Sequence, residues 1–465
     1  MEKEAEVLQD KIRDIDWSSD FDIFSLFDKG ADKIHPAEIA EVLDSIPEDK
    51  ACVTFANLDQ DTQLWAFPYI DVQLQHQLVR HLSLNQATTL LNNLSSDNRT
   101  SFFSDLTALE RTVYINYLDD ENKKETQNFL GYSENSVARL IDTDYAAITQ
   151  DMTIAEASAF LRKNFKDSEA ANVIYVIDNE GKLLDDIQVR RLVLNAPNKK
   201  ITDLMDGNFV SLLISDTQEI AIQKFKDYDR VVIPVVNDDN LLLGVVTIDD
   251  IMDVAEQKET EKIQKFGGVE KLDFPYVKTS LFKLTQKRAT WLIILFLGEM
   301  LTATAMGYFE SEISQAVVLA LFVPLIISSG GNSGSQAATL IIRALALKEL
   351  TLRDWWFVMK REILSGFLLG LVLGSIGMLR ISVWQFFKWY DYGEHWFLIA
   401  LTIFLSLIGI VLWGTLSGSM IPIILKKLKI DPATSSAPFV ATLVDVTGLI
   451  IYFTIAAIVL NGTLL

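Results

Sequence analysis

The stretch Pro438-Phe-Val-Ala-Thr-Leu-Val-Asp-Val-Thr-Gly448 opens an apolar run over residues 438–460 that contains a single charged residue, Asp445. A run of this length can cross about 30 Å of hydrocarbon at about 1.5 Å per residue, so it predicts a membrane-spanning helix. Four more apolar runs precede it, at about residues 291–309, 315–342, 363–383 and 396–425. Residues 281–465 are therefore expected to form a transmembrane domain with five helices.

The charges of the chain divide in the same way as its hydropathy. Residues 1–275 contain 27 Lys and Arg against 52 Asp and Glu, whereas residues 276–465 contain 14 against 10. This excess of carboxylates excludes non-specific nucleic-acid binding by the first part, because phosphate backbones require Lys and Arg. A single cysteine, Cys52, excludes an intrachain disulfide, and four histidines argue against a Cys/His metal site. Any bound metal is expected to have oxygen ligands.

Basic residues in alternate loops set the expected orientation in the cell membrane. The loops on the side of the N-terminus contain Lys283, Lys287, Arg288, Arg343, Lys348, Arg353, Lys360, Arg361, Lys426, Lys427 and Lys429. By the positive-inside rule the N-terminus is cytoplasmic and, after five crossings, the C-terminus is extracellular or periplasmic. The N-terminus also lacks an apolar signal segment, so the acidic part is expected to stay in the cytosol.

Polar residues interrupt three of the apolar runs. Asp445 lies in the last run and Glu299 in the first. An ionised carboxylate inside the bilayer costs roughly 2.5–3.5 kcal/mol, so it typically faces a cavity, an ion path or a partner; the alternative is a protonated packing residue. The second run contains Pro324-Leu-Ile-Ile-Ser-Ser-Gly-Gly-Asn-Ser-Gly-Ser-Gln336. Its glycines allow close helix packing, or can break the helix so that its carbonyl groups face water.

A path lined by Asp445, Asn332 and backbone carbonyl groups favours a hard cation that keeps its own water. Mg²⁺ fits this description because it loses water reluctantly and typically touches one or two carboxylates. The spacing of these residues does not separate Mg²⁺ from Ca²⁺, Mn²⁺ or Co²⁺.

The segment from His35 to Leu130 divides into eight successive blocks of twelve residues. The last residue of every block is apolar, the ninth is apolar in seven blocks, and the first is a helix N-cap type in six. This pattern predicts a solenoid of short helices over residues 35–131, preceded by an N-terminal extension over residues 1–34. A general interaction scaffold and an acidic, cation-sensing surface both remain open for it.

From about residue 136 the pattern changes to strands that alternate with helices, and it repeats. Tyr175-Val-Ile-Asp-Asn-Glu-Gly-Lys-Leu-Leu matches Pro234-Val-Val-Asn-Asp-Asp-Asn-Leu-Leu-Leu at a fixed offset of 59 residues. Two α/β units, over residues 136–197 and 200–255 of a domain spanning 132–255, are expected to pack as a pseudo-dimer. A charged connecting helix is expected over residues 249–280.

This order of parts resembles the MgtE family of magnesium transporters over essentially the whole chain. Its most specific motifs are Gly330-Gly-Asn-Ser-Gly-Ser-Gln336 and Pro438-Phe-Val-Ala-Thr-Leu-Val-Asp-Val-Thr-Gly448. The resemblance implies a multidomain fold, with a cytosolic all-α helical repeat, a tandem cystathionine-β-synthase (CBS) pair and a five-helix transmembrane domain. It also implies a homodimer whose pore lies on the two-fold axis. In that pore Asp445 would hold a hydrated Mg²⁺ near Asn332 and the backbone of Gly331 and Ala441.

The resemblance further implies Mg²⁺ sensing on acidic cytosolic surfaces that hold the connecting, or plug, helix closed. The residues that correspond to sensor positions are Asp97, Glu219, Asp229, Asp250, Asp253, Glu261 and Asp431. Lys258 and Lys262 depart from this pattern, as do Thr217 in place of an expected aspartate and Asp185 in place of a glycine. Thr247 and Asp250 also fit a ribose-binding pattern, which leaves open an ATP site in the CBS pair.

The function expected from these features is a Mg²⁺-selective channel that the membrane potential drives and intracellular Mg²⁺ closes. The alternatives are transport of another divalent cation such as Co²⁺, Mg²⁺ efflux, or a membrane-anchored CBS sensor without ion flux. An enzyme is not expected, because the chain has no Walker motif, no Gly-x-Ser-x-Gly and no His-Glu-x-x-His.

Overall fold

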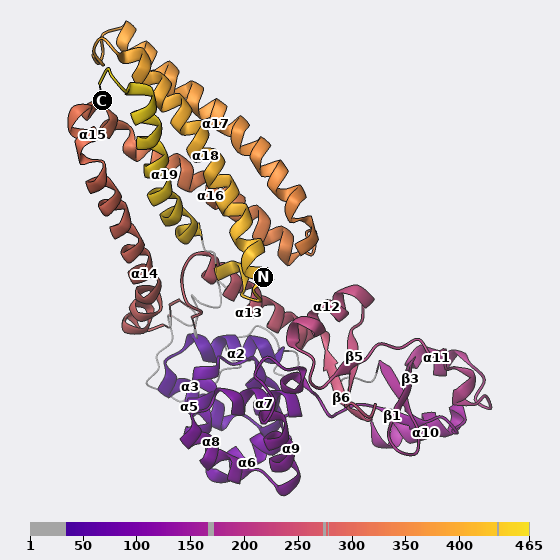
Figure 1. The fold of residues 1–465 in the computed structure, drawn as a ribbon. Helices are drawn as coiled ribbons and strands as arrows, with labels where there is room; N and C mark the ends of the chain where they lie inside the picture. The colour runs from indigo at the N-terminus through magenta and orange to yellow at the C-terminus, as the bar shows by residue number, and fades with distance from the viewer. Residues whose placement is uncertain (1–33, 166–171, 273–275, 278, 435–436, 465) are drawn as a thin grey trace. The chain divides into compact units, whose positions relative to one another are not determined.

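The computed structural model describes residues 34–165, 172–272, 276–277, 279–434 and 437–464. The chain forms two compact units, Met1–Ala255 and Glu256–Leu465 (Figure 1). The predicted N-terminal extension lies outside the described residues except for Ile34, which is buried in the core of the helical repeat.

The eight predicted blocks of twelve residues form eight helices. These are α2 (Pro36–Ser45), α3 (Glu48–Asn57), α4 (Gln60–Ala66), α5 (Val72–His81), α6 (Leu84–Asn93), α7 (Ser96–Asp105), α8 (Ala108–Tyr114) and α9 (Asp120–Leu130), with short 3-10 turns η3 (Phe67–Tyr69) and η4 (Ile115–Tyr117). Seven of the eight ninth residues are buried in the core, and Leu43, Phe55, Leu91 and Phe103 are fully buried. The helical repeat is therefore confirmed.

Most of the predicted N-caps bond as expected. The side chains of Asp59, Asp71, Ser83, Thr107 and Asp119 each accept a hydrogen bond from a backbone N–H of the helix that follows. Ser95 also takes an N-cap position, but its side chain accepts a hydrogen bond from Asn98 Nδ2 and makes no capping bond. Each bonded cap satisfies one backbone N–H that the helix itself leaves without a partner.

Two three-stranded sheets follow the helical repeat. The first contains β1 (Ala147–Thr149), β2 (Val173–Ile177) and β3 (Leu183–Gln188), and the second contains β4 (Leu212–Leu213), β5 (Val232–Val236) and β6 (Leu242–Thr247). In each sheet the first pair of strands is parallel and the second is antiparallel. The bounds of β5 and β6 are those of β2 and β3 advanced by the predicted offset, so the internal repeat is confirmed.

Three helices of substantial length complete this α/β pair: α10 (Ile154–Asn164), α12 (Gln218–Tyr228) and α13 (Ile248–Phe266), together with the shorter α11 (Val189–Leu194). The connecting helix α13 ends at Phe266, earlier than the predicted range of 249–280. Gly268 follows in the left-handed region at φ +70°, and a Cβ there would lie 2.4 Å from the Trp291 ring. A backbone turn that only glycine adopts easily therefore stops the helix.

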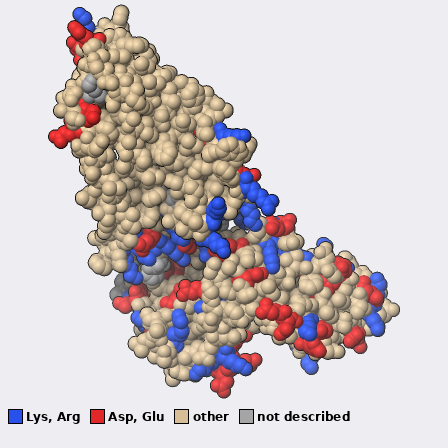
Figure 2. Space-filling view, viewed as in Figure 1, with Lys and Arg blue, Asp and Glu red and all other residues tan. Residues whose placement is uncertain are grey.

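The second unit contains the five predicted membrane helices. They are α14 (Leu281–Tyr308), α16 (Val323–Ala346), which a 3-10 segment η7 (Val317–Phe322) precedes, α17 (Trp355–Phe386), α18 (Trp396–Lys427) and α19 (Ala437–Leu460). A short helix α15 (Glu310–Gln315) follows α14. All five are long and apolar enough to cross a membrane. On the face seen in Figure 2, most of the flank of this unit lacks charged side chains.

The second membrane helix is not broken at its glycine-rich stretch, so close helix packing is the alternative that the structure supports. Helix α16 runs without interruption through its glycine-rich stretch. Its glycines instead bring its backbone against α18: a Cβ on Gly418 would lie 2.0 Å from the carbonyl oxygen of Gly334, and one on Gly414 would lie 2.5 Å from that of Gly330. Close packing of two helix backbones, rather than exposed carbonyl groups, therefore accounts for these small residues.

Candidate ion pathway

Three of the four predicted pore residues meet where α16 contacts α19. A Cβ on Gly331 would lie 3.4 Å from Ala441 Cβ and 3.5 Å from Asp445 Oδ1. Gly331 itself is buried, whereas Ala441 and Asp445 are partly exposed. The absence of a side chain at Gly331 thus leaves the Asp445 carboxylate beside the α16 backbone, where polar atoms of both helices are close to one another.

Asn332, the fourth predicted pore residue, points out of the bundle. Its Nδ2 atom donates to Ser328 Oγ at 3.4 Å, and both side chains are exposed. Gln336 and Thr339 are exposed at helical spacing on the same face of α16. We name Ser328, Asn332, Gln336 and Thr339 the polar stripe of α16. Hydrocarbon offers these groups no hydrogen-bond partners, so the stripe requires water or protein opposite it.

In the first unit, two predicted sensor residues from distant parts of the sequence approach each other. Asp97 lies at the start of α7 and Asp250 in the first turn of α13. Burial, followed by the negative charge of Asp97, raises the pKa of Asp250 to about 8. Burial, together with the charge of Asp249, also raises the pKa of Asp97. Asp249 and Asp142 add further negative charge near Asp250. We name Asp97, Asp142, Asp249 and Asp250 the acidic cluster.

Two members of the acidic cluster, Asp97 and Asp250, have few hydrogen-bond partners among the described residues. Asp97 Oδ1 is buried and has no hydrogen-bond partner among the described residues. Asp250 Oδ2 accepts one hydrogen bond, from Thr247 Oγ1 at 2.8 Å. Carboxylates that are close together and poorly solvated favour either a proton or a bound cation. The same hydrogen bond joins Thr247 to Asp250, the two residues of the predicted ribose-binding pattern. The ATP site itself stays a prediction.

The connecting helix presents a different arrangement at its C-terminal end. Lys265 Nζ lies 2.7 Å from Glu261 Oε1 and 3.5 Å from Asp431 Oδ2. The two predicted sensor residues Glu261 and Asp431 therefore share a lysine from the chain itself. This ion pair lowers the pKa of Glu261 and raises that of Lys265. The spacing of Glu261 and Lys265 along a helix could have indicated their pairing, but nothing local in the sequence indicates the contact with Asp431.

The other three predicted sensor residues lie at exposed positions on or beside α12 and α13. Glu219 is exposed in the first turn of α12 and accepts a hydrogen bond from Asn135 Nδ2 at 2.9 Å. Asp229 is exposed at the C-terminal end of α12 with φ +48°. Asp253 is exposed on α13. Their roles remain predictions from the resemblance.

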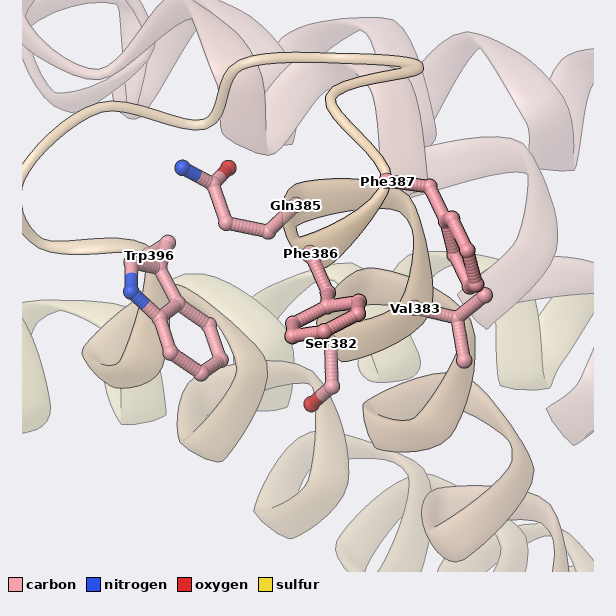
Figure 3. A pocket seen from close by; sticks show the side chains of 6 residues that line it. All are labelled: Ser382, Val383, Gln385, Phe386, Phe387 and Trp396. Atoms are coloured by element: carbon pink, nitrogen blue, oxygen red, sulfur yellow. The ribbon is translucent and has the colours of Figure 1, made fainter.

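Within the described parts of the chain, no three His, Cys, Asp or Glu side chains are arranged to hold a metal ion. A pocket of about 530 Å³ at the junction of α17 and α18 has no charged lining residue either (Figure 3). It is lined by Ser382, Val383, Gln385, Phe386, Phe387 and Trp396. Aromatic side chains of this kind are typical of the membrane–water interface, so the pocket is not a candidate ion site.

Comparison with known families matches three parts of the chain. Residues 323–455 match the MgtE family of divalent cation transporters, residues 34–135 match the MgtE intracellular N domain, and residues 201–256 match the CBS domain.

Three relatives described as magnesium transporter MgtE are similar over most of the chain. The Thermus thermophilus protein is 36% identical over 345 residues, which are 74% of this chain and 74% of that protein. The Enterococcus faecalis protein is 32% identical over 338 residues, 72% of each. The Bacillus subtilis protein is 30% identical over 425 residues, 91% of this chain and 92% of that protein.

Two solved structures are also similar to the chain. The cytosolic domain of the Mg²⁺ channel MgtE in complex with ATP is 25% identical, with a TM-score of 0.46, over 48% of this chain and 91% of that one. The soluble part of a magnesium transporter is 21% identical, with a TM-score of 0.39, over 55% and 98%.

Proposed function

This chain belongs to the MgtE family of divalent cation transporters, and on that premise we propose that it is a Mg²⁺ channel. The membrane potential drives Mg²⁺ inward, and Mg²⁺ in the cytosol closes the path. Its N-terminus lies in the cytosol and its C-terminus outside the cell, as the basic residues of alternate loops indicate.

The position of Asp445 is the observation that carries this proposal. Its carboxylate lies beside Gly331 and Ala441, within an apolar run of a membrane helix. A charge at this depth is costly unless it faces water or an ion. One carboxylate surrounded by backbone and small side chains suits Mg²⁺, which keeps most of its water and touches few protein oxygens.

A second copy of the chain completes the path in this proposal. The polar stripe of α16 is exposed in the single chain and unsuited to lipid. In a homodimer whose two stripes face each other, Asn332 and Gln336 of both copies contact the same water-filled space.

The energy that drives Mg²⁺ inward makes a gate necessary. Moving two positive charges through ~100 mV releases about 4.6 kcal/mol, which would accumulate Mg²⁺ far above its external concentration. We assign the sensor to the acidic cluster, because Asp97 of the helical repeat and Asp250 of α13 repel each other unless a proton or a cation lies between them. Mg²⁺ there favours the arrangement in which the two residues are close.

The ion pairs of Lys265 provide a second link, from the connecting helix to the membrane domain. Lys265 joins Glu261 to Asp431, the residue that follows α18 and its short loop. A positive charge is thus already present between two residues that the family resemblance assigns to Mg²⁺. In this chain the closed arrangement therefore depends on bound Mg²⁺ less than the sequence pattern alone suggests.

Replacing Asp445 tests the proposal directly. We expect Asp445→Asn to lower Mg²⁺ flux into proteoliposomes at least about tenfold, which corresponds to ~1.4 kcal/mol. Glu394→Gln is the matched control, because Glu394 is an exposed carboxylate outside the membrane helices. Undiminished flux in Asp445→Asn would remove this residue from the path. The absence of flux in the wild-type protein would favour a membrane-anchored sensor.

A further inference from the structure

A second carboxylate lies inside the membrane unit, on a helix that the proposed pathway does not yet include. Glu299 is exposed on α14, eight residues into an apolar run. No hydrogen bond or ion pair joins it to another described residue. An ionised carboxylate exposed to lipid is strongly unfavourable, so the position requires an explanation.

The packing of α14 against α19 brings Glu299 to the level of Asp445. The two helices lie side by side and run in the same direction (Figure 1). At Gly298 they touch closely, because a Cβ there would lie 2.8 Å from Thr442 Cγ2. Asp445 follows Thr442 by about one helical turn, and Glu299 follows Gly298 directly. This contact places both carboxylates next to the site where α14 and α19 touch.

A buried hydroxyl group beside Glu299 is consistent with water or an ion at this level. Thr302 lies about one turn after Glu299, on the same side of α14. Its Oγ1 atom is buried and has no hydrogen-bond partner among the described residues. Glu299 and Thr302 on α14 therefore lie opposite Thr442 and Asp445 on α19. We name these four residues the polar seam.

Little of α14 is covered by the rest of its own unit. Only 6% of its most apolar 18-residue window is buried, against 39% for α19 and 50% for α18. Because α14 packs against α19 along one side and is largely exposed elsewhere, the polar seam lies near the margin of the bundle. A water-filled path between two copies of the chain can reach that margin.

We propose that Glu299 is a second carboxylate of the ion pathway and acts with Asp445 on the water shell of the same cation. This inference rests on the proposed function. Two carboxylates at one level attract a divalent cation more strongly than a monovalent one, because each charge on the ion interacts with both. Glu299 would therefore set the affinity of the path for external Mg²⁺, whereas Asp445 remains necessary for conduction.

The test compares the concentration dependence of flux among variants in proteoliposomes. We expect Glu299→Gln to raise the half-saturating external Mg²⁺ concentration about fivefold, since it removes one charge near a divalent ion. Maximal flux at saturating Mg²⁺ should stay within about twofold, because Asp445 is retained in this variant. Glu299→Asp should retain the wild-type half-saturating concentration. Glu310→Gln, which neutralises an exposed glutamate of α15, is the matched control.

Three outcomes separate this inference from the proposed function. An unchanged half-saturating concentration in Glu299→Gln, with Asp445→Asn inactive, overturns only the role of Glu299. Loss of maximal flux without a change in half-saturating concentration assigns Glu299 to packing and also overturns it. If the wild-type protein carries no Mg²⁺, both proposals fail. Should Glu299→Gln not be recovered folded, Glu299→Ala replaces it with the same expected shift.

Discussion

At the scale of single residues, Asp250 combines burial with neighbouring negative charge. Its pKa rises to about 8 because burial disfavours the charged form and Asp97 repels it. The carboxyl group is therefore largely protonated in the folded protein below that pH. Mg²⁺ and a proton compete for the same oxygens, so the sensor proposed here depends on pH.

The pH dependence of stability follows from the direction of this shift. A carboxyl whose pKa is raised on folding stabilises the folded state while it is protonated, and that contribution is lost as the pH rises towards about 8. We expect the full-length protein in EDTA to melt at a lower temperature at pH 8.5 than at pH 6, by about 2–4 °C for each kcal/mol lost.

Mg²⁺ and a neutral variant distinguish this cause from general alkaline destabilisation. Millimolar Mg²⁺ should restore the melting temperature at pH 8.5 and change it little at pH 6. Asp250→Asn should remove most of the difference between the two pH values. An equal pH dependence in Asp250→Asn and wild type would show that Asp250 does not carry the effect.

Other residues show how far the sequence could predict local roles. Asp185 stands where the family resemblance leads one to expect glycine, and the sequence alone gives no reason. It is fully buried, and its Oδ2 accepts hydrogen bonds from the backbone N–H groups of Asp206 and Gly207 at 2.7 and 3.0 Å. At the equivalent position of the second CBS unit, a Cβ on Gly244 would lie 2.5 Å from the Asp142 carbonyl oxygen. The aspartate at 185 and the glycine at 244 therefore each suit a neighbouring segment that is distant in sequence.

At the scale of elements, the glycines of α16 and α18 set the distance between two membrane helices. A Cβ on Gly418 would lie 2.0 Å from a backbone oxygen of α16, which cannot move without its helix. We expect Gly418→Ala to destabilise the membrane unit by about 1–3 kcal/mol or more, as overpacking does. Thermal unfolding of the detergent-solubilised protein measures the change.

A second glycine of the same unit is the control for that substitution. A Cβ on Gly307, near the end of α14, meets nothing within 4 Å. Gly307→Ala should therefore leave the melting temperature unchanged or raise it slightly, since alanine favours a helix. A Gly418→Ala protein as stable as Gly307→Ala would contradict the close packing of α16 and α18.

The connecting helix allows a test of the lysine link. We expect Lys265→Gln to increase Mg²⁺ flux at low internal Mg²⁺, because Glu261 and Asp431 then repel each other without a cation between them. At high internal Mg²⁺ the ion replaces the lysine and flux should fall to the wild-type level. The difference in flux between low and high internal Mg²⁺ should therefore be larger in Lys265→Gln than in the wild-type protein.

Lys262→Gln is the matched control, because it removes one positive charge from the exposed part of the same helix. It should leave the dependence on internal Mg²⁺ as in wild type. If Lys265→Gln behaves like Lys262→Gln, the contact of Lys265 with Asp431 does not contribute to the gate.

The helices that follow a local sequence pattern were predictable. Where a helix ends, or whether it is broken, depended on contacts with other helices and loops. The twelve-residue period predicted the eight helices, because each block buries its own apolar positions. Two features of the helices depended on such contacts. Helix α16 continues through its glycines because α18 packs against them, and α13 stops at Phe266 because Gly268 turns beside Trp291. Such packing partners lie far away in sequence.

At the scale of the whole molecule, composition alone separated an acidic part from a membrane part. Five apolar runs and the two-fold repeat of strands were enough to predict the fold class, which the structure confirms. The family resemblance predicted a site at Asp445, Gly331 and Ala441, and the structure brings these three residues together. The sequence did not identify Lys265 as the partner of Asp431, since this pairing joins two segments more than a hundred residues apart.

The whole account depends on a path for Mg²⁺ that Mg²⁺ itself closes. The most direct measurement is Mg²⁺ flux into proteoliposomes that contain only this chain, under an inside-negative potential, with internal Mg²⁺ either low or at several millimolar. We predict flux at low internal Mg²⁺ that stops at high internal Mg²⁺. Equal flux in both conditions would contradict the gate, and no flux in either would contradict the channel.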